Sequence, residues 1–144
     1  MPRALKILKH LVYVDDWYIC ISSSWRHIST LDELASWLEI GRDRILGQTP
    51  DGELVNGIYI AQIRGEEIKH WLVESRKDGT IAENAVFVIL DDNSDMRDDQ
   101  LKFFIQTEWF VPEDESFAGL NWEHYQKIKR VVYKYQHDYI KLPH

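Results

Sequence analysis

The segment from Thr30 to Gln48 constrains the fold of this chain more than any other. Thr30 can cap the N-terminus of a helix, and Glu33 completes a capping box with it. Apolar residues then recur at helical spacing, at Leu31, Leu34, Ala35 and Leu38. Gly41 is expected to turn the chain, and a short second helix is expected to run to Gln48, before a Thr-Pro-Asp-Gly turn. The segment therefore predicts a pair of helices near residues 30–48.

Several other segments favour strands. The stretch 11–23 is rich in Val, Ile, Tyr and Trp and predicts a strand or a hairpin. A β-meander is expected over 57–63, 68–75 and 85–90, the last being a wholly apolar run that is typical of a buried strand. Residues 66–76 also fit a helix, so this second strand has an open alternative. A short helix is expected over 100–105.

The C-terminal segment has the clearest helical pattern. One face gathers apolar and aromatic residues, at Tyr125, Ile128, Val131, Val132, Tyr135 and Tyr139. The nearly opposite face is basic, with Lys127, Arg130, Lys134 and Lys141. Together the patterns predict one globular α+β domain over residues 1–144. It would have an antiparallel sheet of about four strands, the helical pair, and a long C-terminal amphipathic helix packed on one side.

Composition narrows the class of protein. A chain of 144 residues with 44% apolar residues can bury a core as one domain. Cys20 is the one cysteine of the sequence, so no internal disulfide or cysteine-based zinc site is predicted, and a cytoplasmic setting is expected. No apolar run approaches the roughly 20 residues that span a bilayer, so no membrane partner is expected.

Charge is unevenly distributed. The formal net charge is -7, which disfavours nucleic acid as a partner. Residues 91–115 carry nine acids against two bases, whereas residues 127–144 carry five bases against one acid. A dipolar surface of this kind bears on partner choice and association rate more than on fold.

The Thr30–Gln48 segment resembles the helix-turn-helix of DNA-binding regulators. The apolar positions of that motif correspond to Ala35, Leu38, Ile40 and Ile45, although Glu39 stands where the turn usually has glycine. The resemblance implies that residues of the second helix enter the major groove and contact base edges. Those residues would be Arg42, Arg44 and Gln48.

A second alternative is a metal-dependent hydrolase or nuclease. Asp91, Asp92 and Asp95 follow an apolar strand, and carboxylates there can bind Mg²⁺ or Ca²⁺. Pro50–Asp51 and Glu67-x-Lys69 also have the letters of a metal nuclease set. A solvated acidic loop fits the same aspartates, so no metal ligand, cofactor or catalytic residue is predicted from these patterns.

The leading hypothesis is a small, non-catalytic intracellular binding protein. Such a protein would act through a protein–protein interface, as an inhibitor, an immunity protein or a phage accessory factor, with a homodimer as an open alternative. Exposed Trp, Tyr and Arg carry much of the binding energy at such interfaces. The predicted partner-binding residues are Asp91, Asp92, Asp95, Asp98, Asp99, Trp122, Arg130, Tyr133 and Lys134.

Overall fold

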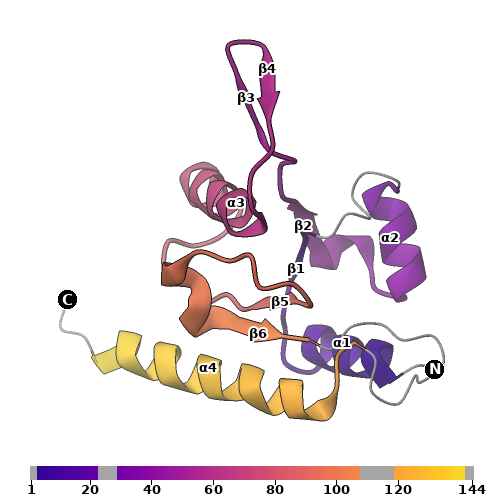
Figure 1. Ribbon diagram of the computed structural model, residues 1–144. Helices are drawn as coiled ribbons and strands as arrows, with labels where there is room; N and C mark the ends of the chain where they lie inside the picture. The colour runs from indigo at the N-terminus through magenta and orange to yellow at the C-terminus, as the bar shows by residue number, and fades with distance from the viewer. Residues whose placement is uncertain (1–2, 23–28, 108–118, 142–144) are drawn as a thin grey trace. The chain divides into compact units, whose positions relative to one another are not determined.

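The computed structural model describes residues 3–22, 29–107 and 119–141 (Figure 1). The elements in chain order are α1 (Arg3–Tyr13), β1 (Ile19–Ile21), α2 (Leu31–Leu38), the 3₁₀ helix η2 (Arg42–Arg44), β2 (Ile45–Gln48), β3 (Glu53–Val55), β4 (Ile58–Ile60), α3 (Arg64–Asp78), β5 (Ile89–Asp91), the 3₁₀ helix η3 (Asp98–Phe103), β6 (Phe104–Gln106) and α4 (Trp122–Lys141). They form two compact units. We call Leu8–Glu83 the central unit, and Met1–Ile7 with Asn84–His144 the terminal unit.

The central unit is built on a parallel pair of strands. β1 pairs with β2, with Ile19 opposite Ile45 and Ile21 opposite Gln48. Parallel strands need a crossover between them, and here the crossover contains α2. The helix buries its apolar side against the strands, and the resulting core consists of Ile21, Leu34, Ala35 and Ile45 with Ile19, Leu31 and Leu38 around it.

An antiparallel hairpin follows the carboxyl end of β2. β3 and β4 pair with Val55 opposite Ile58, and the turn between them consists of Asn56 and Gly57. Both turn residues have positive φ, 50° and 78°, which is what a two-residue hairpin turn of the favoured twist requires. Figure 1 shows the hairpin extending away from β2 and α3. Its apolar residues Val55, Ile58 and Ile60 are exposed.

α3 closes the central unit. It buries Ile68, Leu72 and Ser75, which share one helical face, and it ends at Gly79 in the left-handed conformation with φ 82°. Trp71 lies against β2 at Gly47, where an added Cβ would come within 3.4 Å of the indole nitrogen. A methyl group at this position would therefore just touch the indole, so α3 packs closely on β2 here.

The terminal unit contains the second parallel pair. β5 pairs with β6, with Ile89 opposite Phe104 and Asp91 opposite Gln106. α4 packs against β6 and buries Tyr125 and Ile128, as Figure 1 shows for its course along that strand. The Phe103 ring lies between two other rings, 4.5 Å from Phe87 and 4.8 Å from Tyr135.

This architecture corrects the prediction of a four-stranded antiparallel sheet. The strands form two parallel pairs and one hairpin within the described residues. The predicted second helix of the pair near residues 30–48 is wrong, because β2 occupies Ile45–Gln48. The predicted strand 68–75 is also wrong, and the helical alternative for residues 66–76 is confirmed by α3. The meander prediction failed because consecutive strands pair in parallel here, and a parallel pair needs a long crossover where a meander has a short turn.

The structure bears on two expectations from composition, the absence of a membrane span and the place of Cys20. No helix of the described ranges combines the length and apolarity needed to cross a bilayer. Cys20 is half-buried in β1. The prediction that the whole chain acts as one domain stays a prediction.

Candidate functional site

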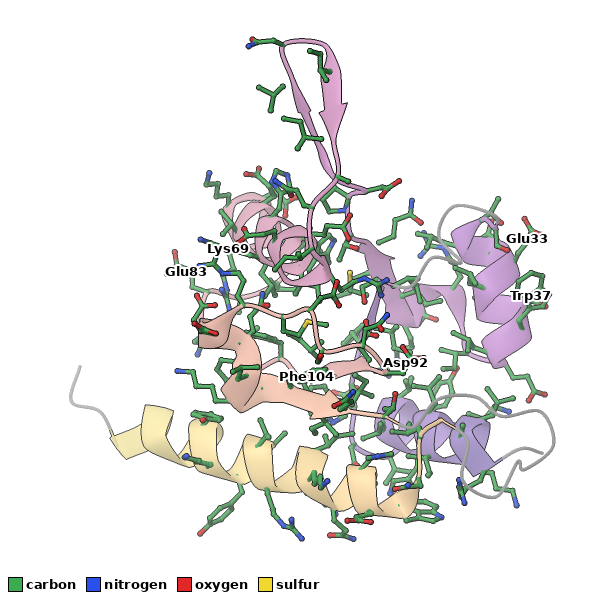
Figure 2. All side chains as sticks on the ribbon, viewed as in Figure 1. Glu33, Trp37, Lys69, Glu83, Asp92 and Phe104 are labelled. Carbon is green, nitrogen blue, oxygen red and sulfur yellow. The ribbon has the colours of Figure 1, made fainter. Side chains whose placement is uncertain are left out.

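The strongest candidate site lies at the carboxyl end of β5. Asp91 is the last residue of this strand and Asp92 follows it, as Figure 2 shows with Asp92 labelled. Ligands of open sheets with parallel strands bind outside the carboxyl ends of the strands. The parallel pairing with β6 brings Gln106 to the same edge. Two acids and one amide therefore meet where such a fold normally binds its ligand.

Asp91 is fixed by the chain around it. Its side chain is buried, with 8% of the residue exposed, and its Oδ1 accepts a hydrogen bond of 2.9 Å from the Asn93 N–H. This is the local turn that aspartate favours. The Asp91 carbonyl also accepts a 2.9 Å hydrogen bond from the Thr107 N–H, which continues the pairing beyond β6. The result is a rigid turn that directs the next residue out of the strand.

Asp92 has an uncommitted carboxylate. Its backbone carbonyl accepts a 3.0 Å hydrogen bond from Gln106 Nε2, so the main chain is held in place. Its half-buried side chain makes no hydrogen bond or ion pair with any residue that the structure describes. A carboxylate held at a strand end without a protein partner is a suitable ligand for a cation or a hydrogen-bond donor.

The remaining predicted acids are spread along the following loop. Asp95 is exposed, next to the buried Met96. Asp98 and Asp99 lie in the first turn of η3, and Asp99 pairs with Arg97 at 3.1 Å. The structure therefore brings Asp91 and Asp92 together at the strand end and places the other three acids further along the chain.

The two carboxylates at the end of β5 suit Mg²⁺ better than a metal ion that is bound by protein side chains alone. In the part of the chain that the structure describes, no three His, Cys, Asp or Glu side chains converge on a point. Mg²⁺ is usually bound by one or two carboxylates together with water and substrate phosphate oxygens. Asp91 and Asp92 supply hard oxygen donors of that kind and number.

The basic and aromatic residues predicted to bind a partner lie elsewhere in the terminal unit. Trp122, Arg130, Tyr133 and Lys134 are all exposed on α4, whereas His124, Tyr125 and Ile128 of the same helix are buried. These four exposed residues lie on α4, whereas Asp91 and Asp92 lie at the end of β5, so the two groups belong to different elements.

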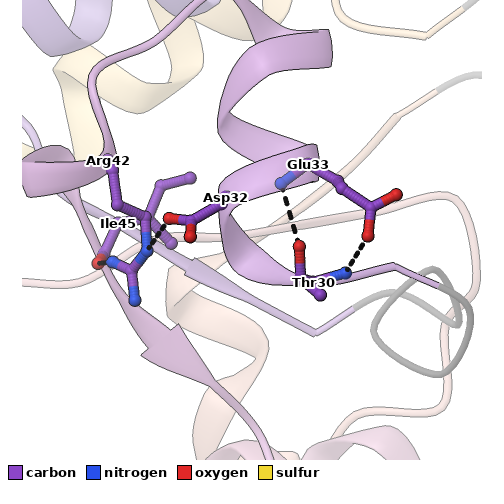
Figure 3. A network of polar contacts seen from close by, with 5 residues as sticks. All are labelled: Thr30, Asp32, Glu33, Arg42 and Ile45. Atoms are coloured by element: carbon purple, nitrogen blue, oxygen red, sulfur yellow. Dashed lines mark hydrogen bonds and ion pairs between the residues drawn. The ribbon is translucent and has the colours of Figure 1, made fainter.

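The geometry required by the helix-turn-helix resemblance is not formed. Arg42 stabilises the packing of α2 on β2, since it pairs with Asp32 at 3.3 Å and donates a 2.7 Å hydrogen bond to the Ile45 carbonyl (Figure 3). Gln48 ends strand β2 and therefore lies on no recognition helix.

Arg44 is also engaged within the central unit. It pairs with Asp16 at 2.6 Å and lies over the Tyr18 ring at 4.8 Å. The hydrogen bond that Arg44 donates to Asp16 raises the pKa of Arg44 above its usual value. The arginines expected to contact bases instead contact their own unit.

Two of the residues that match the metal nuclease pattern, Glu67 and Lys69, do not have the strand-end placement that the pattern requires. Glu67 and Lys69 lie on α3 and not at the end of a strand. Glu67 is buried and accepts a 2.7 Å hydrogen bond from the Gly52 N–H, which ties the base of the hairpin to the helix. Its role is structural.

One residue at the other parallel strand end was not predicted. Thr49 follows β2, is buried, and donates its N–H to the Ile21 carbonyl at 2.9 Å. Its hydroxyl has no hydrogen-bond partner among the described residues. The apolar pair Ile45–Leu46 could have predicted a strand that ends just before Thr49.

Comparison with known proteins identifies the family. The sequence model of the HAD domain in Swiss Army Knife RNA repair proteins matches residues 1–132. Because the match covers most of the chain, the protein belongs to this family. No curated protein and no solved structure matches the chain.

Family membership corrects the leading functional hypothesis. A HAD domain of RNA repair proteins indicates a hydrolase of the phosphatase type. The prediction of a non-catalytic inhibitor or immunity protein is therefore wrong. It failed because the acidic loop was interpreted as a surface for a basic protein, without knowledge that the loop begins at the end of a parallel strand. The metal-dependent hydrolase alternative fits better.

Proposed function

We propose that this chain is a metal-dependent hydrolase domain that acts on phosphate esters at the ends of RNA strands. The observation that carries the proposal is the carboxylate of Asp92, held at the carboxyl end of β5 without a protein partner in the described residues. Membership in a family of RNA repair proteins supports the choice of substrate class.

The residues at the strand end have distinct roles in this proposal. Asp92 and Asp91 would hold Mg²⁺, which when bound neutralises charge on phosphate oxygens as a Lewis acid. Asp91 also positions Asp92, since its bond to the Asn93 N–H fixes the turn. Gln106 donates a 3.0 Å hydrogen bond to the Asp92 carbonyl, and so would limit the motion of Asp92 as a metal-binding residue.

The substrate class follows from the chemistry of RNA breakage. A cleaved strand carries phosphate at one of its new ends, and that phosphate decides whether the ends can be rejoined. Removing it is phosphomonoester hydrolysis, which proceeds with charge build-up on phosphate oxygens. A cation held by carboxylates stabilises such charge.

The test is a phosphate-release assay with and without MgCl₂. The substrates are a short RNA with a 5′-phosphate, the same RNA with a 3′-phosphate, and p-nitrophenyl phosphate as a small substrate without RNA. We expect magnesium-dependent release that Asp92→Asn reduces by about 100-fold or more in kcat/KM, the scale of losing one preorganised electrostatic group.

A matched control comes from the same acidic stretch. Asp98→Asn removes one exposed acid from η3 and should leave kcat/KM within about two-fold, since salt screens the charges of exposed side chains. The proposal fails if no substrate is hydrolysed with magnesium present. It fails equally if Asp92→Asn retains full activity.

Other expectations about the setting stay predictions. The cytoplasmic location rests on the single cysteine, and a homodimer rests on the exposed aromatics of α4. Gel filtration of the purified chain measures the second directly.

A further inference from the structure

The outer face of α4 gathers exposed basic and aromatic residues on one side of a well-anchored helix. We define this outer face as Trp122, Lys129, Arg130 and Tyr133, flanked by Lys127 and Lys134. At 100° per residue the first four fall within about a third of the helix circumference. The buried residues His124 and Ile128 lie on the far side of the helix, the buried Tyr125 borders the outer face, and α4 packs against β6. The orientation of the outer face toward solvent is thus fixed within the terminal unit.

The charge of this face contrasts with the rest of the chain. Residues 122–135 carry four bases and one acid, Glu123, whereas the whole chain has a formal net charge of -7. Like charges on one helix repel, and they are retained at a cost of a few tenths of a kcal/mol per pair. A local excess of positive charge on an acidic protein favours a polyanionic partner.

Contacts with rings hold several of these cations in place. Lys129 Nζ lies 5.1 Å from the centre of the Tyr125 ring, and Lys134 Nζ lies 5.3 Å from that of Tyr135. Lys102 of η3 lies 5.6 Å from the same Tyr135 ring and adds a further cation beside the helix. Cation–π contacts within about 6 Å are attractive, so the ammonium groups are partly ordered before any ligand binds.

Two aromatic side chains project among the cations. Trp122 is 46% exposed and Tyr133 is 72% exposed. Trp122 meets Tyr125 edge-on at 5.3 Å, which orients its ring on the helix surface. The two residues are 11 positions apart, or about 17 Å along the axis. That length equals about five nucleotides at the 3.4 Å spacing of a stacked strand.

We propose that the outer face of α4 binds a segment of single-stranded RNA. Phosphates would contact Lys127, Lys129, Arg130 and Lys134, and bases would stack on Trp122 and Tyr133, which is the combination that single-strand binders use. The choice of RNA over other polyanions rests on the proposed function, and the surface would hold the body of a substrate whose end is hydrolysed. A membrane is a poorer match, because an interfacial helix inserts its apolar face and that of α4 is already packed on β6.

The test is fluorescence anisotropy of the full chain with an end-labelled, unphosphorylated single-stranded RNA, over a range of salt concentrations. Each phosphate contact contributes about 0.7 to the slope of log K against log salt for a single strand. We expect the double variant Lys129→Ala with Arg130→Ala to lower that slope by about 1.4. Trp122→Ala or Tyr133→Ala should weaken binding about 5- to 150-fold with the slope unchanged, as stacking predicts.

Matched controls separate this surface from the general charge of the protein. Lys69→Ala with Lys77→Ala removes two exposed bases from α3 and should leave both affinity and slope unchanged. Trp37→Ala removes an exposed tryptophan from α2 and should have no effect on RNA binding. Circular dichroism melts of every variant measure whether each keeps the stability of the parent.

The outcomes distinguish the inference from the proposed function. Phosphate release from p-nitrophenyl phosphate should persist in the α4 variants, while the KM for phosphorylated RNA rises with little change in kcat. If the α3 and α4 double variants bind RNA equally well, the inference is overturned even if the chain is an active phosphatase. Binding of the parent to vesicles containing phosphatidylserine, but not to RNA, would also overturn it.

Discussion

The two parallel strand pairs of this protein differ in the groups that they place at their carboxyl ends. In the central unit, polar groups at this edge of β1 and β2 are enclosed by the fold, with Thr49 buried and Glu67 bonded to Gly52. In the terminal unit, β5 ends in Asp92, whose carboxylate has no partner in the described part of the chain. The central edge therefore holds a bonded carboxylate and a neutral, buried hydroxyl, while the edge of β5 leaves a charge available for a ligand.

The largest expected effect is the loss of stability when the core beneath β1 and β2 is truncated. Leu34 is 1% exposed and packs α2 onto β1 and β2. Leu34→Ala should lower the free energy of unfolding by about 2–5 kcal/mol, since it removes buried methyl groups and leaves a cavity. Urea denaturation measures this. Trp37→Ala is the control on the exposed face of the same helix, where Figure 2 labels the indole, and should cost far less.

A second prediction compares the acids of the two edges directly. Glu67→Ala should destabilise the protein by about 1–3 kcal/mol, because it leaves the Gly52 N–H without its acceptor. Asp92→Ala should change the free energy of unfolding by no more than about 0.5 kcal/mol, since the side chain loses no hydrogen bond or ion pair with a described residue. Equal destabilisation of Glu67→Ala and Asp92→Ala in the same urea titration would contradict the proposed difference between the two strand ends.

The third prediction concerns the helix cap of the central unit. Thr30 Oγ1 accepts a 3.1 Å hydrogen bond from the Glu33 N–H, and Glu33 Oε1 accepts one of 3.2 Å from the Thr30 N–H (Figure 3). Thr30→Ala should cost about 1 kcal/mol of stability by thermal unfolding. Thr30→Ser keeps the acceptor and should cost only a fraction of that. An equal loss in both variants would mean that the cap contributes nothing.

The smallest expected effect is a pH dependence at the end of α3. The Thr80 hydroxyl donates a 2.6 Å hydrogen bond to Asp78 Oδ1, and this bond, with a second from the Thr80 N–H, lowers the pKa of Asp78. A carboxyl with a lowered pKa in the folded state stabilises the protein above its unfolded pKa of about 3.9, and the contribution is lost as pH falls through the folded pKa.

Thr80→Ala tests that cause. An NMR titration of the Asp78 carboxyl should show its pKa rising toward the ordinary value, while Thr80→Ser keeps the donor and should leave it lowered. No change on removing the hydroxyl would show that the backbone bond alone sets the pKa.

Local signals in the sequence predicted some elements correctly. The capping box at Thr30 marks the start of α2, and the apolar run 85–90 overlaps β5. The strand Ile45–Gln48 was missed because its partner β1 lies far upstream, and parallel pairing leaves no local pattern. The helical face of α3 was visible at Ile68 and Leu72, but its abundance of polar residues also suited turns between strands. The Asn-Gly turn of the hairpin was a missed local signal.

The sequence singled out Asp91 and Asp92 as partner-binding residues and, in an alternative, as metal ligands, and their role stays a prediction. Asp91 and Asp92 were named as acids after a buried strand, and the structure places them there. The sequence could not show that the Asp91 side chain accepts a hydrogen bond from the Asn93 N–H, while the Asp92 carboxylate has no polar partner among the described residues. That distinction depends on the pairing of β5 with a strand that follows it by more than ten residues.

The β3–β4 hairpin also sets how its own amides behave. Two strands of three residues each with an exposed apolar face have little to hold them together beyond their turn. Its backbone should therefore open and close many times during each unfolding event of the central unit. Deuterium uptake at Val55 and Ile58 would then report local breathing of the hairpin, and only protection deeper in β1 and β2 would report the stability of the fold.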